Sequence, residues 1–158
     1  MRSSGGMQSA PSHPWWSGSE LPLLKLEIPT GFENDHLRQA FESYHQWLTN
    51  EVDRPYGLLA DLHQVLGGNA VQRRIIAEYE RKNRPSEVRF STGQAIVSDR
   101  RLVRGFVTAI FWLEPPVYPY RVFEQRHEAR LWALEDLERG IAAFPDGEYW
   151  TSRTRQAG

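Results

Sequence analysis

The chain contains no cysteine, which excludes disulfides, thiolate catalysis and cysteine-based metal sites. It has no excess charge of either sign, because 19 Lys and Arg stand against 20 Asp and Glu. Nothing global therefore favours nucleic acid or an anionic membrane. Long hydrophobic runs are also missing: the longest apolar tract, Leu102–Leu113, is interrupted by Arg104 and is too short to span a bilayer. Residues 1–20 lack the apolar core of a signal peptide, so we expect a cytoplasmic protein without a membrane span.

A length of 158 residues with 40% hydrophobic residues suits one domain with short tails. Residues 1–20 are rich in Ser, Gly and Pro, which predicts a disordered N-terminal tail. Within it, Trp15 and Trp16 could dock onto the domain or onto a partner. We expect the domain to cover residues 21–143 and a second tail to cover residues 144–158.

Hydrophobic periodicity predicts strands that alternate with helices along the domain. We expect the second helix to end before Pro85, because a residue that precedes proline disfavours helix. The third helix is apolar on more than one side. The predicted strands are 21–29, 56–62, 93–98 and 120–123, and the predicted helices are 36–50, 69–84, 102–113 and 125–141. This alternation predicts an α/β fold with a four-stranded, mainly parallel sheet and flanking helices.

Three segments carry a family resemblance: "YGLLADLHQV" from Tyr56, "GQAIVSDRRLVRGFVTAIFWL" from Gly93, and "YPYRVFEQRHEARLWALEDL" from Tyr118. With the order of elements, they resemble the STAS domain of bacterial anti-sigma-factor antagonists, and more closely its SpoIIAA-like relatives, over residues 21–140. The resemblance implies a non-catalytic bacterial regulatory or scaffold module that acts by protein–protein interaction.

The region after the second strand departs from this pattern. Switch-type family members carry a serine or threonine at the start of the helix that follows this strand, and its phosphorylation abolishes partner binding. No serine or threonine lies between Asp61 and Glu80 in this chain, and Asn69 takes roughly that place. We therefore expect the fold without the phospho-switch.

A possible ligand pocket lies where the second and third strands end. Asp61 and His63 end one strand and Ser98 ends the other, at the edge where open α/β sheets bind ligands. Asn69 stands where a glycine turn meets a helix. Asp61, His63 and Ser98 could serve as orienter, base and nucleophile of a small hydrolase, although Ser98 lies in no G-x-S-x-G elbow. A strand-ending role for Asp61 and His63 is the simpler interpretation.

The apolar helix 102–113 predicts a surface that binds a protein partner or a second copy of the chain. Aromatic residues and arginines are enriched in interface hot spots. The alternative is a helix buried between its neighbours and the proline-rich loop 114–119. The predicted anchors are Phe106, Ile110, Phe111, Trp112, Tyr118 and Tyr120, with Arg100, Arg101 and Arg104 as a charged rim.

Other ligand classes have less support in the sequence. No two of the five histidines are spaced by two to four residues, so the usual metal-ligand spacing is missing. We expect no metal, no cofactor and no nucleic-acid partner, because the arginine-rich helices also carry interleaved acidic residues. Some SpoIIAA-like relatives also resemble SEC14-type lipid-binding domains. A lipid or other hydrophobic ligand between helix 102–113 and the sheet is therefore an alternative, and its signature would be a sizeable apolar cavity.

Overall fold

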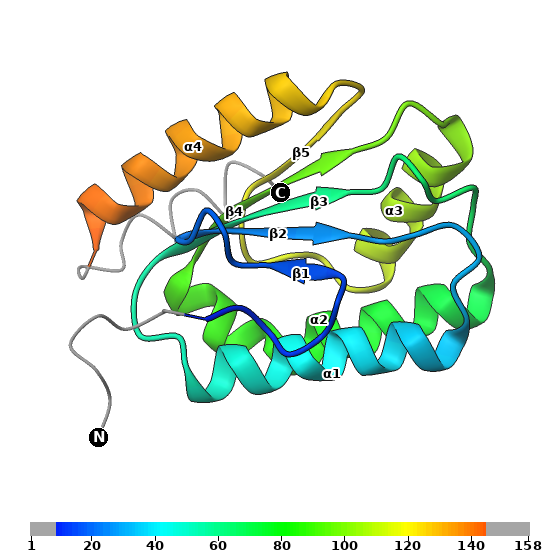
Figure 1. Ribbon diagram of the computed structural model, residues 1–158, viewed down its shortest axis with the longest axis horizontal. Helices are drawn as coiled ribbons and strands as arrows, with labels where there is room; N and C mark the ends of the chain where they lie inside the picture. Colours follow the sequence, from blue (N-terminus) through cyan, green and yellow to red (C-terminus); the bar gives the residue numbers. More distant parts are fainter. Residues whose placement is uncertain (1–8, 145–158) are drawn as a thin grey trace.

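Four helices flank a five-stranded sheet in the computed structural model, which describes residues 9–144 (Figure 1). The strands lie in the order β1-β2-β3-β4-β5. The first pair is antiparallel and the other neighbours are parallel. The strands are β1 (Trp16–Ser17), β2 (Leu23–Glu27), β3 (Tyr56–Asp61), β4 (Ser91–Val97) and β5 (Tyr120–Phe123).

The helices cover the two faces of the sheet unequally. Three of them, α1, α2 and α3, pack on one face, and α4 lies alone on the other (Figure 1). Each of the first three connects two parallel strands, which is the usual crossover for such a sheet. The helices are α1 (Asn34–Asn50), α2 (Ala70–Phe90), α3 (Arg101–Leu113) and α4 (Arg126–Ala143).

Side-chain alternation along the strands produces one hydrophobic core on each face. On β2, Leu24 and Leu26 point to the three-helix side, whereas Leu23 points to the α4 side. The α4 side has the smaller core, formed with Ala129, Ala133 and Leu137 of that helix. One helix cannot cover the whole face, so the β2 side chains beyond Leu23 on this side, Lys25 and Glu27, are left to solvent in part.

The predicted α/β class with a mainly parallel sheet is confirmed, but the sheet has one strand more than expected. The additional strand β1 lies inside the segment predicted to be a disordered tail. Trp16 explains the difference, because it is only 7% exposed and its indole N–H donates to the Ala40 carbonyl at 2.9 Å. Its ring stacks on Tyr44 at 4.9 Å. Of the two predicted tails, residues 1–8 and 145–158 lie outside the described part of the chain.

Helix α2 continues through Pro85 to Phe90, so the predicted end before this proline is wrong. Proline removes one backbone donor from a helix interior, but the turns beyond it are fixed by burial. Asn83, Glu87 and Phe90 are all buried against the sheet and α1. The packing of these side chains holds the last turns together despite the lost hydrogen bond.

None of the helices within residues 9–144 combines the length and the apolar character that crossing a membrane requires.

Candidate functional site

Polar side chains gather at the edge of the sheet where the parallel strands end. Asp61 is the last residue of β3, and Glu27, the last residue of β2, lies opposite it in the strand register. Arg126 begins α4 directly after the loop that leaves β5. Ligands of open α/β sheets bind at this carboxyl edge, so the chemistry of these side chains decides what the site can do.

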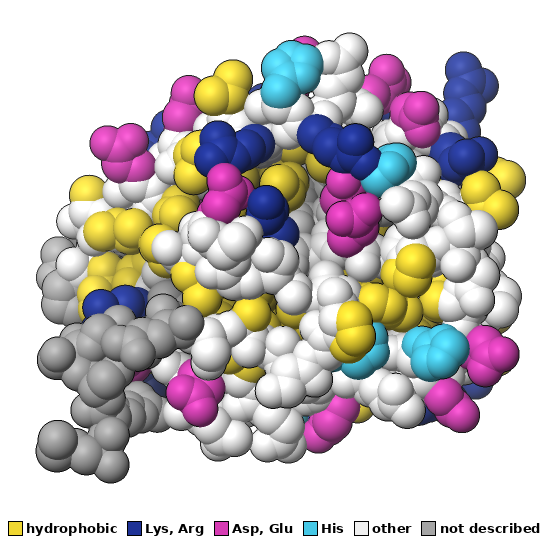
Figure 2. All heavy atoms as spheres, viewed as in Figure 1, with side chains coloured by type: hydrophobic (Ala, Val, Ile, Leu, Met, Phe, Trp, Pro, Cys, Tyr) yellow, Lys and Arg dark blue, Asp and Glu magenta, His cyan; other side chains and the backbone are white. Residues whose placement is uncertain are grey.

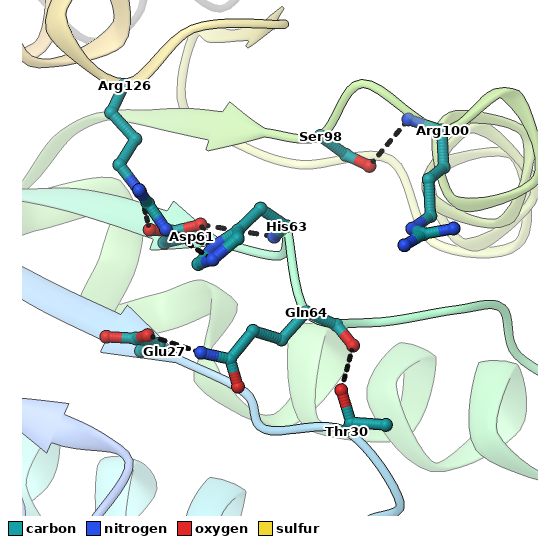
Figure 3. A network of polar contacts seen from close by, with 8 residues as sticks. All are labelled: Glu27, Thr30, Asp61, His63, Gln64, Ser98, Arg100 and Arg126. Atoms are coloured by element: carbon teal, nitrogen blue, oxygen red, sulfur yellow. Dashed lines mark hydrogen bonds and ion pairs between the residues drawn. The ribbon is translucent and has the colours of Figure 1, made fainter.

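Asp61, His63 and Arg126 form one polar cluster (Figure 3). One oxygen of Asp61, Oδ1, lies 2.7 Å from Nδ1 of His63 and also accepts the His63 backbone N–H at 3.1 Å. The other oxygen, Oδ2, accepts Nε–H of Arg126 at 2.5 Å, and the guanidinium also contacts the imidazole ring. Asp61 and His63 are therefore in contact, as predicted. Arg126, which lies 65 residues after Asp61 in the chain, joins them.

The pKa of Asp61 lies below its ordinary value. Partial burial acts to raise this pKa, because it disfavours the charged form. The hydrogen bonds from Arg126 and His63 favour the carboxylate more strongly, and they decide the direction. Asp61 is consequently an ionised acceptor at neutral pH, and it holds both the ring and the guanidinium in place.

Ser98 does not join this cluster. Its side chain is fully buried and points towards α3, where its Oγ accepts the Arg100 backbone N–H at 3.2 Å (Figure 3). Asn69 is the N-cap of α2 and accepts the Gln72 N–H at 2.9 Å. The predicted Asp61–His63–Ser98 triad is therefore not assembled, because the serine serves as a local turn residue, and Asn69 has a capping role.

Donor atoms of a type that binds metal ions also converge here. One ligand atom each from Glu27, Asp61 and His63 lie within 4.8 Å of one another. The guanidinium of Arg126 already occupies the space beside two of them. A metal ion held by all three donors would therefore meet a positive side chain of the protein.

Helix α3 has two adjacent apolar stripes, of which one is buried and the other is covered only in part. Val103, Val107 and Ile110 pack into the core. The neighbouring stripe at i, i+4, i+7 and i+11 is Leu102, Phe106, Ala109 and Leu113. Leu102 is 77% exposed and Leu113 is 59% exposed. We call these four residues the outer stripe of α3.

The predicted anchors on and near α3 divide into two groups. Trp112 is 82% exposed, Tyr120 is 37% exposed and Phe106 is half-buried, so all three present surface to solvent. Ile110, Phe111 and Tyr118 are buried and cannot be anchors for a partner. For Ile110 and Phe111 the reason is that a helix apolar on two sides does not show which side faces the sheet. Tyr118 lies in the loop after α3, and its hydroxyl contacts Glu80 and Gln94 in the interior.

The three arginines predicted to form a charged rim lie at the start of α3. Arg100 and Arg101 are exposed, and Arg104 is half-buried and donates to Glu124 at 2.8 Å. A pair of this kind near the surface contributes little to stability. Arg100 and Arg101 are thus exposed to solvent, and Arg104 is in a surface ion pair.

A second group of titratable side chains lies between the sheet and α2. Glu80 and Glu87, two turns apart, border a mostly apolar cavity of about 80 Å³. The Tyr118 hydroxyl lies 3.0 Å from Glu80 and 2.7 Å from Gln94 Oε1, and Tyr44 donates to Glu87 at 3.1 Å. Burial is the largest cause that raises the pKa of both carboxyl groups, for Glu80 to about 7 and for Glu87 well above its ordinary value.

This cavity bears on the lipid alternative. Pockets for small molecules usually enclose about 300–1,000 Å³, and the cavity of about 80 Å³ is well below that range. It is suited to a few water molecules that bridge the carboxyl and hydroxyl groups. This cavity beside α3 is therefore smaller than the one that would mark a hydrophobic ligand.

Searches against protein-family models, curated proteins and solved structures found no match to this chain. The site is therefore interpreted from its own geometry.

Sequence reasoning missed several residues of the carboxyl edge. Lys25 and Glu27 share one face of β2, and Arg126 and Arg130 lie one turn apart on α4. Both spacings are visible in the sequence. The sequence does not show that these four side chains lie close together, because this depends on α4 covering only part of its face of the sheet. On α2, the polar residues Gln72 and Glu87 are buried, whereas Val71 is exposed.

Proposed function

We propose that this chain is a non-catalytic regulatory or scaffold module of the STAS-like, SpoIIAA-like type, which binds a protein partner or a second copy through the outer stripe of α3. The observation that carries the proposal is the exposure of Leu102 and Leu113 in the outer stripe, together with that of Trp112 on the same helix. Clustered exposed side chains of this size usually mark an interface.

The surroundings of the outer stripe support an interface. Arg100 and Arg101 precede it and are exposed, and Trp112 is exposed beside Leu113. An aromatic centre with an arginine rim is the composition of interface hot spots. Asn69 caps α2 where switch-type relatives carry a phosphorylated hydroxyl, so binding would be constitutive with respect to that switch.

The test compares two leucines with equal exposure on opposite sides of the molecule. Leu113 on α3 and Leu131 on α4 are each 59% exposed. We expect Leu113→Glu to weaken association at least about tenfold, because the charge must be desolvated at an apolar contact. Leu131→Glu should leave association unchanged. Sedimentation velocity over a concentration series measures self-association, and quantitative affinity capture measures a different partner.

Circular dichroism and thermal melting of both variants should match the unsubstituted protein, since both positions are on the surface. Equal association or equal capture by all three proteins would contradict the proposal. So would a loss that Leu131→Glu shares.

A further inference from the structure

A groove runs along the α4 side of the sheet, distinct from the outer stripe of α3. It lies between α4 and the segment before β1, and its volume is about 580 Å³, within the usual range for small-molecule sites. Leu59 and Val97 lie on its sheet side, and Trp15 lies on the opposite wall from α4. Figure 2 shows a hollow on this face between two groups of charged side chains.

One end of this groove carries a net positive charge. Lys25 of β2 and Arg130 of α4 both line it. They share one carboxylate, because Glu20 lies 3.2 Å from Lys25 Nζ and 2.7 Å from Arg130 Nη2. Hydrogen bonds from Arg130 and Lys25 hold the pKa of Glu20 below its ordinary value. Two cations against one anion leave a charge of +1.

The other end carries a net negative charge. Glu27 and Asp61, opposite each other in the strand register, both line the groove. Arg126 is the cation beside them and pairs with Asp61. Gln64 donates to Glu27 at 3.2 Å without changing the charge. Two anions against one cation leave a charge of −1 while His63 is neutral.

The distance between the two ends is set by regular backbone geometry. Lys25 and Glu27 are two residues apart on one strand face, which corresponds to about 6.6 Å. Arg126 and Arg130 are four residues apart on α4, which corresponds to about 6 Å along the helix axis. The β2 wall changes sign over this length, whereas α4 carries an arginine at each end. The groove is polar along its axis because cations are in excess at the Lys25 end and anions are in excess at the Glu27 end.

We propose that this groove binds a small dipolar molecule that carries an ammonium and a carboxylate about 6–7 Å apart, of the dipeptide class. Its carboxylate contacts Lys25 and Arg130 beside Glu20, and its ammonium contacts Glu27 on the side away from the Arg126–Asp61 pair. The apolar surface of Leu59 and Val97 contacts the body of the ligand. A simple anion or cation satisfies only one end and meets repulsion or no partner at the other.

The probes are the dipeptides Ala-Ala, Ala-Leu and Ala-Phe, each compared with its N-acetylated and C-amidated forms. We expect saturable binding of at least one dipeptide to the full-length protein at low salt, measured by NMR titration and calorimetry. Removing either ligand charge should weaken binding by about tenfold or more, the ratio that corresponds to one charged contact.

Two variants assign each ligand charge to one end of the groove. In Glu27→Gln, N-acetylation should no longer weaken binding, whereas C-amidation still should. In Lys25→Gln the pattern should reverse. Lys82→Gln on α2, which also removes a lysine with an ion-paired carboxylate, should change neither response. Melting curves check that the variants fold, and both groove positions lie on the open face of β2.

Three outcomes would overturn this proposal. One is the absence of saturable binding for all three dipeptides at millimolar concentrations. A second is that inorganic phosphate or a divalent cation binds to the same residues as tightly as the dipeptides. The third is an N-acetylation penalty that remains unchanged in Glu27→Gln.

Discussion

At the scale of single residues, the most unusual group is the acid–phenol cluster around Glu80. One Tyr118 proton cannot serve both Glu80 and Gln94, although both acceptors lie within hydrogen-bond distance. A protonated Glu80 resolves this, because its own O–H can donate to Tyr118, whose proton then goes to Gln94. The raised pKa of Glu80, about 7 and caused mainly by burial, agrees with this arrangement.

The raised pKa has a consequence for stability. Unfolded Glu80 would ionise near its ordinary pKa of 4.5, whereas in the folded protein it keeps its proton up to about pH 7. The free energy of unfolding should therefore fall as the pH rises between these values, because the unfolded state then releases a proton that the folded state retains.

We expect Glu80→Gln to remove much of this slope and to raise the free energy of unfolding by about 2 kcal/mol near pH 8, less than the full shift because the residue is partly exposed. Urea denaturation at about pH 5, 6, 7 and 8 measures it. Glu78→Gln, at an exposed position of the same helix, is the control. Glu87 also has a raised pKa and should leave part of the slope in place. A slope as steep in Glu80→Gln as in the unsubstituted protein would show that Glu80 does not take up the proton on folding.

At the scale of elements, the position of α4 depends on one close approach. A Cβ atom at Gly140 would lie 2.2 Å from Thr92 Cγ2 on β4. Thr92 is fully buried, and its hydroxyl donates to the Tyr56 carbonyl at 3.1 Å, so it cannot easily move. The helix is predictable from the spacing of Ala129, Ala133 and Leu137. The need for a glycine at position 140 is not, because it arises from a strand far away in the sequence.

Alanine should have opposite effects at two helical glycines. Gly140→Ala should destabilise the protein by about 1–3 kcal/mol through overpacking. Gly105→Ala on α3 has nothing within 4 Å of the new methyl group and should stabilise by up to about 1 kcal/mol through helix propensity. Chemical denaturation of both variants measures the two effects. Equal changes in the two variants would contradict this account of α4.

At the scale of the whole molecule, the domain begins earlier than its composition indicates. The sequence predicted the class of fold, the main parallel strands and the four helices, because hydrophobic periodicity is local. It could not predict β1, since a strand of two residues shows no hydrophobic periodicity. The surrounding Ser, Gly and Pro residues also indicate disorder. Trp16 becomes informative only when α1 and β2 are in place to surround it.

We expect Trp16→Ala to cost about 3–5 kcal/mol of unfolding free energy, the range for large-to-small changes in a core. Trp112→Ala removes the same side chain from a position that is 82% exposed and should change stability by less than about 0.5 kcal/mol. Urea midpoints of both variants provide the comparison. Similar losses in the two variants would mean that β1 does not belong to the folded domain.

The unequal cover of the sheet has a consequence for how this protein can diverge. Three helices make the crowded side intolerant of substitution, since each change there disturbs packing in several directions. The α4 side leaves Lys25 and Glu27 of β2 beside water, where new side chains alter recognition without disturbing the interior. Descendants of this sequence could thus acquire new specificities on one side while the other preserves the architecture.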